Sequence, residues 1–258
     1  FALAVTGCGS APEPTQRPTP GVPSEPSSAS LLGREWARAG VSPTKRIDDA
    51  TFLRRATLDL LGRIPTRDEF YAFEAERGGD KRATLVRRLL DHPDRAAHLG
   101  RTWELILMGP PTRERLADRD ALRRYLQRQF AADVPWDAIV RDIVTAEGVS
   151  SLGGDRRELR RAPNEAARAE EEQRAGVHGA TNLPWRYARQ PADLAGVTAR
   201  AFLGMRVQCP QCHDHKTESW KQQDFWAFTS ALAHLSAERQ DGGQGELFVF
   251  DVRDADAP

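Results

Sequence analysis

The sequence predicts a mostly α-helical protein, an irregular helical bundle around a C-terminal Cys-x-x-Cys-His loop, with at most one short strand pair near the C-terminus. Apolar residues recur at helical spacing in one segment after another. Capping residues precede these segments, and glycine or proline follows them. Only residues 246–252 alternate as a strand does, with Leu247 and Val249 against Phe248 and Phe250.

The first two helices have signals at both ends. Residues 47–61 form the first, where Asp48 or Asp49 can cap the start and Gly62 ends it. Thr66 and Glu69 have the spacing of a capping box. That box opens a helix with three aromatic residues, Phe70, Tyr71 and Phe73.

Four more helices are expected next. Asp80 can cap one of them, and another follows Pro93 and ends at Gly109. Apolar stripes at helical spacing predict the other two, over residues 121–130 and 136–144. Such stripes are typical of core packing rather than of a cofactor site.

Residues 148–181 interrupt the pattern with adjacent glycines and many charges, and we expect an exposed charged insertion there. Helical spacing resumes over residues 194–205. Ser219 and Gln222 have capping-box spacing and predict a last helix through residues 225–235.

The N-terminal residues indicate export. An apolar stretch, a small residue and Cys8 follow one another, an order that resembles the lipobox of bacterial lipoproteins. We interpret residues 1–8 as the remnant of a lipoprotein signal peptide, and the Pro- and Ser-rich residues 9–35 as a disordered tether. The helical domain then spans residues 36–240, and residues 241–258 form a C-terminal tail. An acylated Cys8 predicts a protein of the periplasm or cell surface, anchored by lipid to a bacterial membrane, in our interpretation the outer one. The alternative is a spare cysteine in a disordered tail.

Composition excludes several classes of function. The 37 basic and 37 acidic side chains give a formal net charge of zero, which excludes the broad cationic field expected of a nucleic-acid-binding protein. The 258 residues, 40% apolar and 29% charged, have the composition of a soluble globular protein with a hydrophobic core. The sequence contains neither a phosphate-binding glycine loop nor a Gly-x-Ser-x-Gly elbow, so nothing in it argues for nucleotide chemistry or hydrolysis.

One motif carries recognisable chemistry, Cys209-Pro210-Gln211-Cys212-His213, the attachment signature of c-type haem. Two thiols three residues apart can reach the two vinyl groups of a porphyrin, and the histidine that follows supplies the proximal iron ligand. We therefore predict one covalent haem c, with Cys209 and Cys212 on the porphyrin and His213 on the iron. Haem c attachment takes place outside the cytoplasm, in agreement with an export signal.

Two other uses of the same residues remain open. Cys209 and Cys212 can form a disulfide or a redox-active pair. Together with His213 and His215 they can also hold zinc, although four ligands within seven residues are cramped. Either use favours a structural or interaction lipoprotein over a cytochrome.

The residues around the motif provide further candidates. Phe225 and Phe228 are suitable walls for a porphyrin, and equally suitable as ordinary core aromatics. His215 follows the proximal ligand too closely to reach the far face of the ring, and can hydrogen-bond a propionate instead. His234 has the distance to return over the iron as its sixth ligand, and His178, in an expected loop, can also reach it.

Several ordered stretches resemble a bacterial family of unknown function, the planctomycete cytochrome-like domain of PSCyt type two. These stretches are residues 47–66, 85–93, 134–137 and 201–216. The first ends in Asp-Leu-Leu-Gly-Arg-Ile-Pro-Thr, and the last contains Cys-Pro-Gln-Cys-His-Asp-His-Lys. The resemblance implies an exported, haem-binding, cytochrome-like unit whose biochemical role is not established.

The sequence departs from the family pattern at three places. Thr102 stands where relatives have histidine, Thr217-Glu218-Ser219 stands where they continue Phe-Asp-Pro, and Met205 replaces an aliphatic residue. None of these changes affects His213 as the proximal ligand. We therefore expect an exported haem c protein for electron transfer or haem-based sensing at the cell envelope, with an unknown redox partner or as part of an envelope complex. We expect no substrate turnover by this chain alone.

Overall fold

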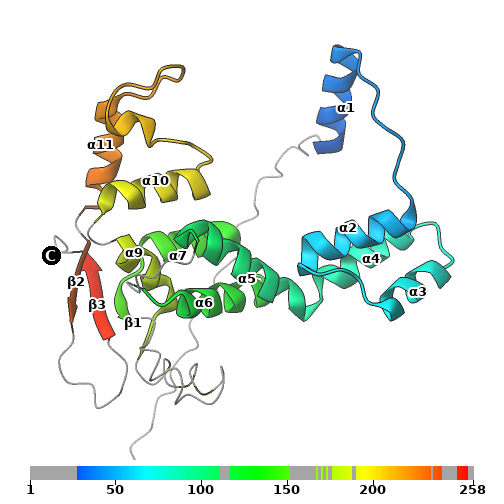
Figure 1. The fold of residues 1–258 in the computed structure, drawn as a ribbon, viewed down its shortest axis with the longest axis horizontal. Helices are drawn as coiled ribbons and strands as arrows, with labels where there is room; N and C mark the ends of the chain where they lie inside the picture. Colours follow the sequence, from blue (N-terminus) through cyan, green and yellow to red (C-terminus); the bar gives the residue numbers. More distant parts are fainter. Residues whose placement is uncertain are drawn as a thin grey trace, which may run out of the picture. The chain divides into compact units, whose positions relative to one another are not determined.

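The computed structural model describes most of the chain, namely residues 28–110, 117–151, 167, 170, 173, 176–187, 190–233, 235–239 and 249–254. Helices dominate the described residues (Figure 1), which confirms the mostly α class. The chain divides into two compact units, residues 1–47 and residues 48–258.

The first unit contains helix α1 (Ser28–Ala39). The expected disordered tether over residues 9–35 is therefore wrong for its last part, because residues 28–35 are helical. The helix is rich in alanine, leucine and arginine, which are strong helix formers. An ion pair across one turn, Arg38 Nη1 to Glu35 Oε1 at 2.8 Å, adds to its stability. Cys8 lies outside the described residues.

Three helices of the second unit share one hydrophobic cluster: α2 (Asp49–Leu61), α3 (Arg67–Ala75) and α4 (Lys81–Leu90). The predicted starts of α2 and α3 are confirmed, since Asp48 caps α2 and the capping box of Thr66 and Glu69 opens α3. Gly62 ends α2 in the left-handed region at φ 70°. The buried members of the cluster are Leu53, Leu61, Phe73, Leu85 and Leu89.

Asp80 does not cap α4 with its side chain, contrary to the prediction. Its backbone lies at φ −123° and ψ 28°, outside the extended region from which a capping side chain reaches the first amides. The start of α4 is held by Asp49 instead, whose carboxylate lies 2.5 Å from Lys81 Nζ and 2.7 Å from Arg82 Nη2. The hydrogen bond from Lys81 is the largest cause that lowers the pKa of Asp49.

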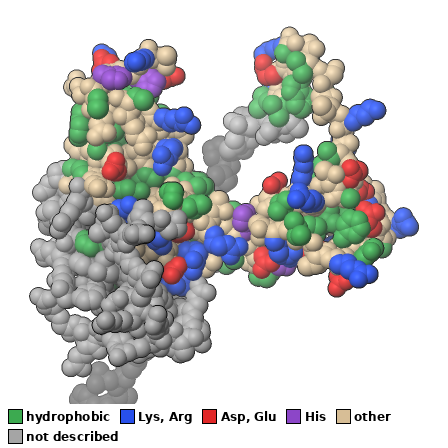
Figure 2. Space-filling model, viewed as in Figure 1, with side chains coloured by type: hydrophobic (Ala, Val, Ile, Leu, Met, Phe, Trp, Pro, Cys, Tyr) green, Lys and Arg blue, Asp and Glu red, His purple; other side chains and the backbone are tan. Residues whose placement is uncertain are grey.

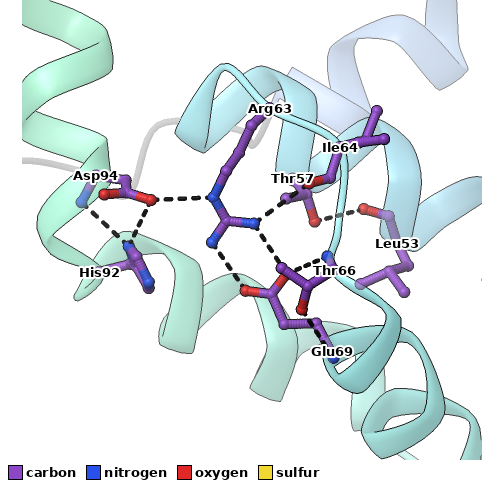
Figure 3. A network of polar contacts seen from close by, with 8 residues as sticks. All are labelled: Leu53, Thr57, Arg63, Ile64, Thr66, Glu69, His92 and Asp94. Carbon is purple, nitrogen blue, oxygen red and sulfur yellow. Dashed lines mark hydrogen bonds and ion pairs between the residues drawn. The ribbon is translucent and has the colours of Figure 1, made fainter.

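An ion-pair network joins the turn between α2 and α3 to the start of α5 (Pro93–Met108), as Figure 3 shows. The Arg63 guanidinium donates to both carboxylate oxygens of Glu69 at 2.9 Å, and its Nε donates to Asp94 Oδ2 at 3.0 Å. Glu69 Oε2 also accepts from the amide of Thr66 at 2.6 Å. These bonds, first of all those from Arg63, lower the pKa of Glu69 to about 2.

Replacement of Glu69 by glutamine is expected to lower the free energy of unfolding by about 1 kcal/mol at neutral pH. Arg63 loses one of its two charged partners and keeps Asp94, whereas the new amide can still accept from Thr66. The folded-state pKa of Glu69 lies below its ordinary value of 4.5, so its stabilising charge is fully present above about pH 5 and is lost as the pH falls towards 2. The difference between the two proteins in urea unfolding should therefore shrink across that range. Glu74→Gln, an exposed change on the same helix, is the control; a difference that does not vary with pH would refute the assignment.

The larger hydrophobic core lies among five helices: α5, α6 (Arg119–Ala131), α7 (Trp136–Val144), α9 (Asn182–Tyr187) and α10 (Pro191–Phe202). The helices predicted from apolar stripes over residues 121–130 and 136–144 are confirmed, and these stripes supply much of the core. Asp118 starts α6, because its Oδ1 accepts from the amides of Asp120 at 3.0 Å and Ala121 at 3.1 Å. The most deeply buried side chains of this core include Leu107, Leu122, Leu126, Ile139, Ile143 and Leu183.

A three-stranded antiparallel sheet stands beside these helices, in the order β1 (Gly148–Ser151), β3 (Val249–Asp254), β2 (Leu235–Arg239). The expectation of at most one strand pair is therefore corrected, since β3 pairs on both sides. The residues expected to form a C-terminal tail, 241–258, contain its central strand. The sequences of the two outer strands give only weak signals for a strand. β1 has four residues, and β2 begins at Leu235, where apolar residues at helical spacing had predicted the end of a helix.

The predicted exposed insertion over residues 148–181 is wrong at both of its ends. Ser150, Ala180 and Thr181 are fully buried. The buried Asn182, directly after the segment, joins its two ends, because its Oδ1 accepts from Ser150 Oγ at 3.2 Å. The same oxygen accepts from the amide of Asp118 at 2.8 Å and so also ties the segment to the start of α6. Residues 152–166, in the middle of the segment, lie outside the described residues.

Candidate functional site

The Cys-x-x-Cys-His motif lies between α10 and α11 (Gln222–Ser230), at the short 3₁₀ turn η2 (Cys209–Gln211). The amide of Cys212 donates to the carbonyl of Cys209 at 3.4 Å, so both cysteines belong to one turn. Both thiols are free and exposed, whereas Pro210 between them is buried. Figure 2 shows histidine side chains on the surface over this loop. The motif thus presents two free thiols to solvent from a turn whose proline is buried.

His213 is exposed and follows the turn directly. Its Nδ1 lies 2.7 Å from the carbonyl oxygen of Asp214. A neutral imidazole that donates from Nδ1 to a carbonyl keeps its lone pair on Nε2. This is the tautomer in which metal-bound histidines are commonly held by an outer hydrogen bond.

The residues after the motif tie it to the start of α11. Asp214 Oδ1 accepts from the amide of Gln222 at 2.9 Å, and Gln222 Nε2 donates to the carbonyl of Gln211 at 3.2 Å. His215 is half-buried, and its amide donates to the carbonyl of Trp220 at 2.8 Å. These roles of Asp214 and Gln222 were not predicted. The role of Asp214 has a sequence signal, because a carboxylate that stands shortly before a helix start can bind the free amides there.

A small hydrophobic core supports the motif, made by Ala195, Ala199, Val207 and Phe225. Phe225 is only 1% exposed, so its ring is enclosed by the chain's own side chains. Phe228 and Met205 are partly buried and pack against the same core. The neighbouring Trp226, by contrast, is 45% exposed. Contact of Phe225 or Phe228 with a porphyrin stays a prediction, and the structure gives both rings a packing role.

The start of α11 differs from the prediction. Lys221 is the N-cap, and its amide donates to Asp224 Oδ2 at 3.0 Å. The expected capping box of Ser219 and Gln222 is therefore wrong, because Gln222 is already the first helical residue and its side chain turns back to the motif. The helix also ends at Ser230 rather than at residue 235, where β2 has begun.

Of the two candidate sixth ligands, His234 and His178, the structure describes only His178. His234 is outside the described residues. His178 is engaged elsewhere, since its Nε2 lies 3.5 Å from Asp142 Oδ2 and its ring meets the edge of Tyr125 at a centroid distance of 5.6 Å. The Tyr125 hydroxyl donates to the same carboxylate. Burial, followed by this bond to Asp142, raises the pKa of Tyr125.

The donor set can be compared with what a covalent haem requires. Within the part of the chain that the structure describes, no three Cys, His, Asp or Glu side chains are gathered as metal ligands. Covalent attachment needs no such cage, because it requires two free thiols on one turn and one available imidazole nitrogen. Cys209, Cys212 and His213 offer these groups.

The fold and the motif together define a mostly helical domain with a surface Cys-x-x-Cys-His turn held between two helices. The chain belongs to the PSCyt2 family, described as a protein of unknown function (DUF1549), whose family model matches residues 30–237. The expected family is thereby confirmed. Neither the curated proteins nor the solved structures gave a match. No helix among the described residues has the length and apolar character that crossing a bilayer requires.

Proposed function

We propose that this protein is an exported haem c protein that serves electron transfer or haem-based sensing at the cell envelope. One observation carries the proposal: Cys209 and Cys212 are both free and exposed on a single turn, directly before an exposed His213. Thiols on one turn are the arrangement that the two vinyl groups of a porphyrin demand.

The residues of the chain would share the work as follows. The thiols of Cys209 and Cys212 would hold the porphyrin through two thioether bonds, one to each vinyl group. Nε2 of His213 is the nitrogen available to iron, while its Nδ1 is held by the Asp214 carbonyl. The haem, when bound, supplies one-electron redox chemistry or a site for a small ligand.

Export and anchoring complete the proposal. Thioether attachment of haem takes place outside the cytoplasm, so a haem c protein needs an export signal. The lipobox-like order before Cys8 provides one, and two acyl chains on Cys8 would hold the protein at the membrane. The proposed partner is a redox protein or a larger envelope complex, as expected of a protein that carries electrons.

The test is an optical spectrum of the protein exported in a host with haem c maturation. We expect a Soret band and sharp reduced α and β bands that survive acid–acetone extraction. Cys209→Ala/Cys212→Ala should lose the covalent pigment entirely. His213→Ala should keep the thioethers and change the spectrum, because the iron loses its proximal ligand. Ser219→Ala, an exposed change in the same loop, is the control and should match the wild type.

A colourless protein with intact cysteines would overturn the haem proposal. Zinc analysis and thiol titration would then separate the two alternatives. Stoichiometric zinc lost in Cys209→Ala would show a metal site. Two thiols that titrate only after reduction would show a disulfide, and the protein would then be a structural or interaction lipoprotein.

A further inference from the structure

We propose that His215 is a positioning residue that locks the loop behind the motif and thereby fixes how His213 is presented. The inference about His213 rests on the proposed function, whereas the fold of the loop around His215 does not. The sequence leaves His215 open as a zinc ligand or as a partner for a haem propionate. The contacts of its ring assign it to the protein's own backbone.

The imidazole of His215 closes a turn in the chain that follows it. Its Nδ1 accepts from the amide of Glu218 at 3.1 Å and from that of Thr217 at 3.3 Å. Bonds to the amides two and three residues ahead are those that an asparagine or aspartate oxygen makes in an Asx turn. His215 thus performs the work of an Asx side chain, with a ring nitrogen as the acceptor.

The same contacts leave this ring without a free lone pair. In a neutral imidazole one nitrogen is an acceptor and the other carries the hydrogen. Because Nδ1 accepts from the two amides, the hydrogen lies on Nε2, which can donate but cannot bind a metal ion. His213 has the opposite arrangement, with Nδ1 beside the carbonyl of Asp214. The two histidines of the motif region are therefore held in different tautomers, one for each role.

The chain uses the same device at a second place. His92 is the N-cap of α5, and its Nδ1 accepts from the amide of Asp94, two residues ahead, at 3.1 Å. There the imidazole has a structural role, far in sequence from the Cys-x-x-Cys-His motif. The arrangement at His215 is thus one that this chain also uses to begin a helix.

The lock restrains the backbone on the far side of His213. The amide of His215 donates to the carbonyl of Trp220, which closes the loop of residues 215–220. Asp214, directly before it, is fixed by the amide of Gln222 at the start of α11. His213 therefore stands between the cysteine turn and a pair of anchored residues. Loss of the His215 ring would free the backbone that holds the Asp214 carbonyl against His213.

The first test needs no haem. Nitrogen-15 NMR of the reduced protein, made without haem c maturation, reports the tautomer of each histidine at about pH 8, where an ordinary imidazole is neutral. We expect His215 with its hydrogen on Nε2, and amides of Thr217 and Glu218 protected from exchange. His215→Ala should reduce that protection about tenfold, and His215→Asn should restore most of it, because the Asn oxygen can accept from the same amides. Lys216→Ala, an exposed neighbour, is the control.

The second test uses the protein matured with haem. His215→Ala should still carry covalent haem but show mixed iron ligation and a shifted midpoint potential, and His215→Asn should restore the wild-type spectrum and potential. An Nδ1–H tautomer, or exchange rates that His215→Ala leaves unchanged, would overturn the positioning role. A His215→Asn spectrum like that of His213→Ala would show that His215 is itself a ligand. If no variant binds haem, the proposed function fails, and the tautomer and exchange results still decide the role of His215.

Discussion

Replacement of Gly179 by alanine is expected to lower the free energy of unfolding by about 3 kcal/mol, or the melting temperature by about 6 to 12 °C. Gly179 begins the short turn η1 (Gly179–Thr181), which packs against α6. A Cβ at this position would lie 2.4 Å from the carbonyl oxygen of Ala121 and 2.7 Å from Cβ of Tyr125. Neither atom is the end of a flexible side chain, so the added methyl group can be accommodated only by moving η1 away from α6.

The displacement would also strain the polar contacts that depend on η1. Asn182 follows this turn, and its side chain joins the start of α6 to β1 through Asp118 and Ser150. A shift lengthens these buried hydrogen bonds, and a buried polar group without a partner costs about 1 to 3 kcal/mol. Gly79→Ala is the matched control, since no atom lies within 4 Å of a Cβ there, and it should change the stability by less than about 0.5 kcal/mol. Equal urea midpoints for the two variants would show that η1 does not pack on α6 at this distance.

The helices could be predicted because their signals are local. Asp48, Thr66 with Glu69, and Gly62 stand within a turn of the backbone groups that they satisfy, so sequence spacing is enough to identify them. Asp80 has the right residue type, but its backbone conformation depends on the packing of α4 and on the ion pairs from Lys81 and Arg82 to α2. The failure at Asp80 is therefore a failure to foresee a long-range contact.

The sheet and the burial of residues 180–182 could not be predicted for the same reason. Gly148–Ser151 pairs with Val249–Asp254, about a hundred residues away, and no periodicity within four residues reveals such a partner. Likewise, the burial of Ala180, Thr181 and Asn182 is decided by α6 and β1, although the neighbouring sequence is strongly charged. The charge density of residues 148–181 was a misleading signal at both ends of that segment.

At the candidate site, the sequence predicted which residues belong to the motif better than it predicted the contacts that these residues and their neighbours make. Cys209, Cys212 and His213 are contiguous, so their proximity follows from spacing alone. The turn made by His215 also has a local signal, because a residue that can act as an Asx side chain precedes Thr217 and Glu218. The placement of Phe225 has none, since an aromatic residue at that helical position suits a cofactor wall and a core equally well.

Phe225→Ala is the second large effect that we expect, a loss of about 3 to 5 kcal/mol in the free energy of unfolding of the haem-free protein. The ring is 1% exposed and fills the small core with Ala195, Ala199 and Val207. Two of these neighbours are alanines, whose side chains cannot move into the space left behind, so most of the cavity should persist. Phe225→Leu keeps much of the volume and should cost less than about 1.5 kcal/mol.

Trp226→Ala provides the matched control, because Trp226 is the next residue on α11 and is 45% exposed. Its ring meets Phe225 edge-on at 5.2 Å, so we expect a loss of about 1 kcal/mol from that contact and from partial burial. If Phe225 were a wall of an open haem site rather than part of the core, its removal would leave the haem-free protein nearly as stable as the wild type and weaken only the haem-bound form. Urea unfolding of both forms therefore separates the two roles. Since this small core lies between α10 and α11, which position the Cys-x-x-Cys-His turn, a core role also predicts faster amide exchange at Cys212 and His213 in Phe225→Ala, with no change in Trp226→Ala.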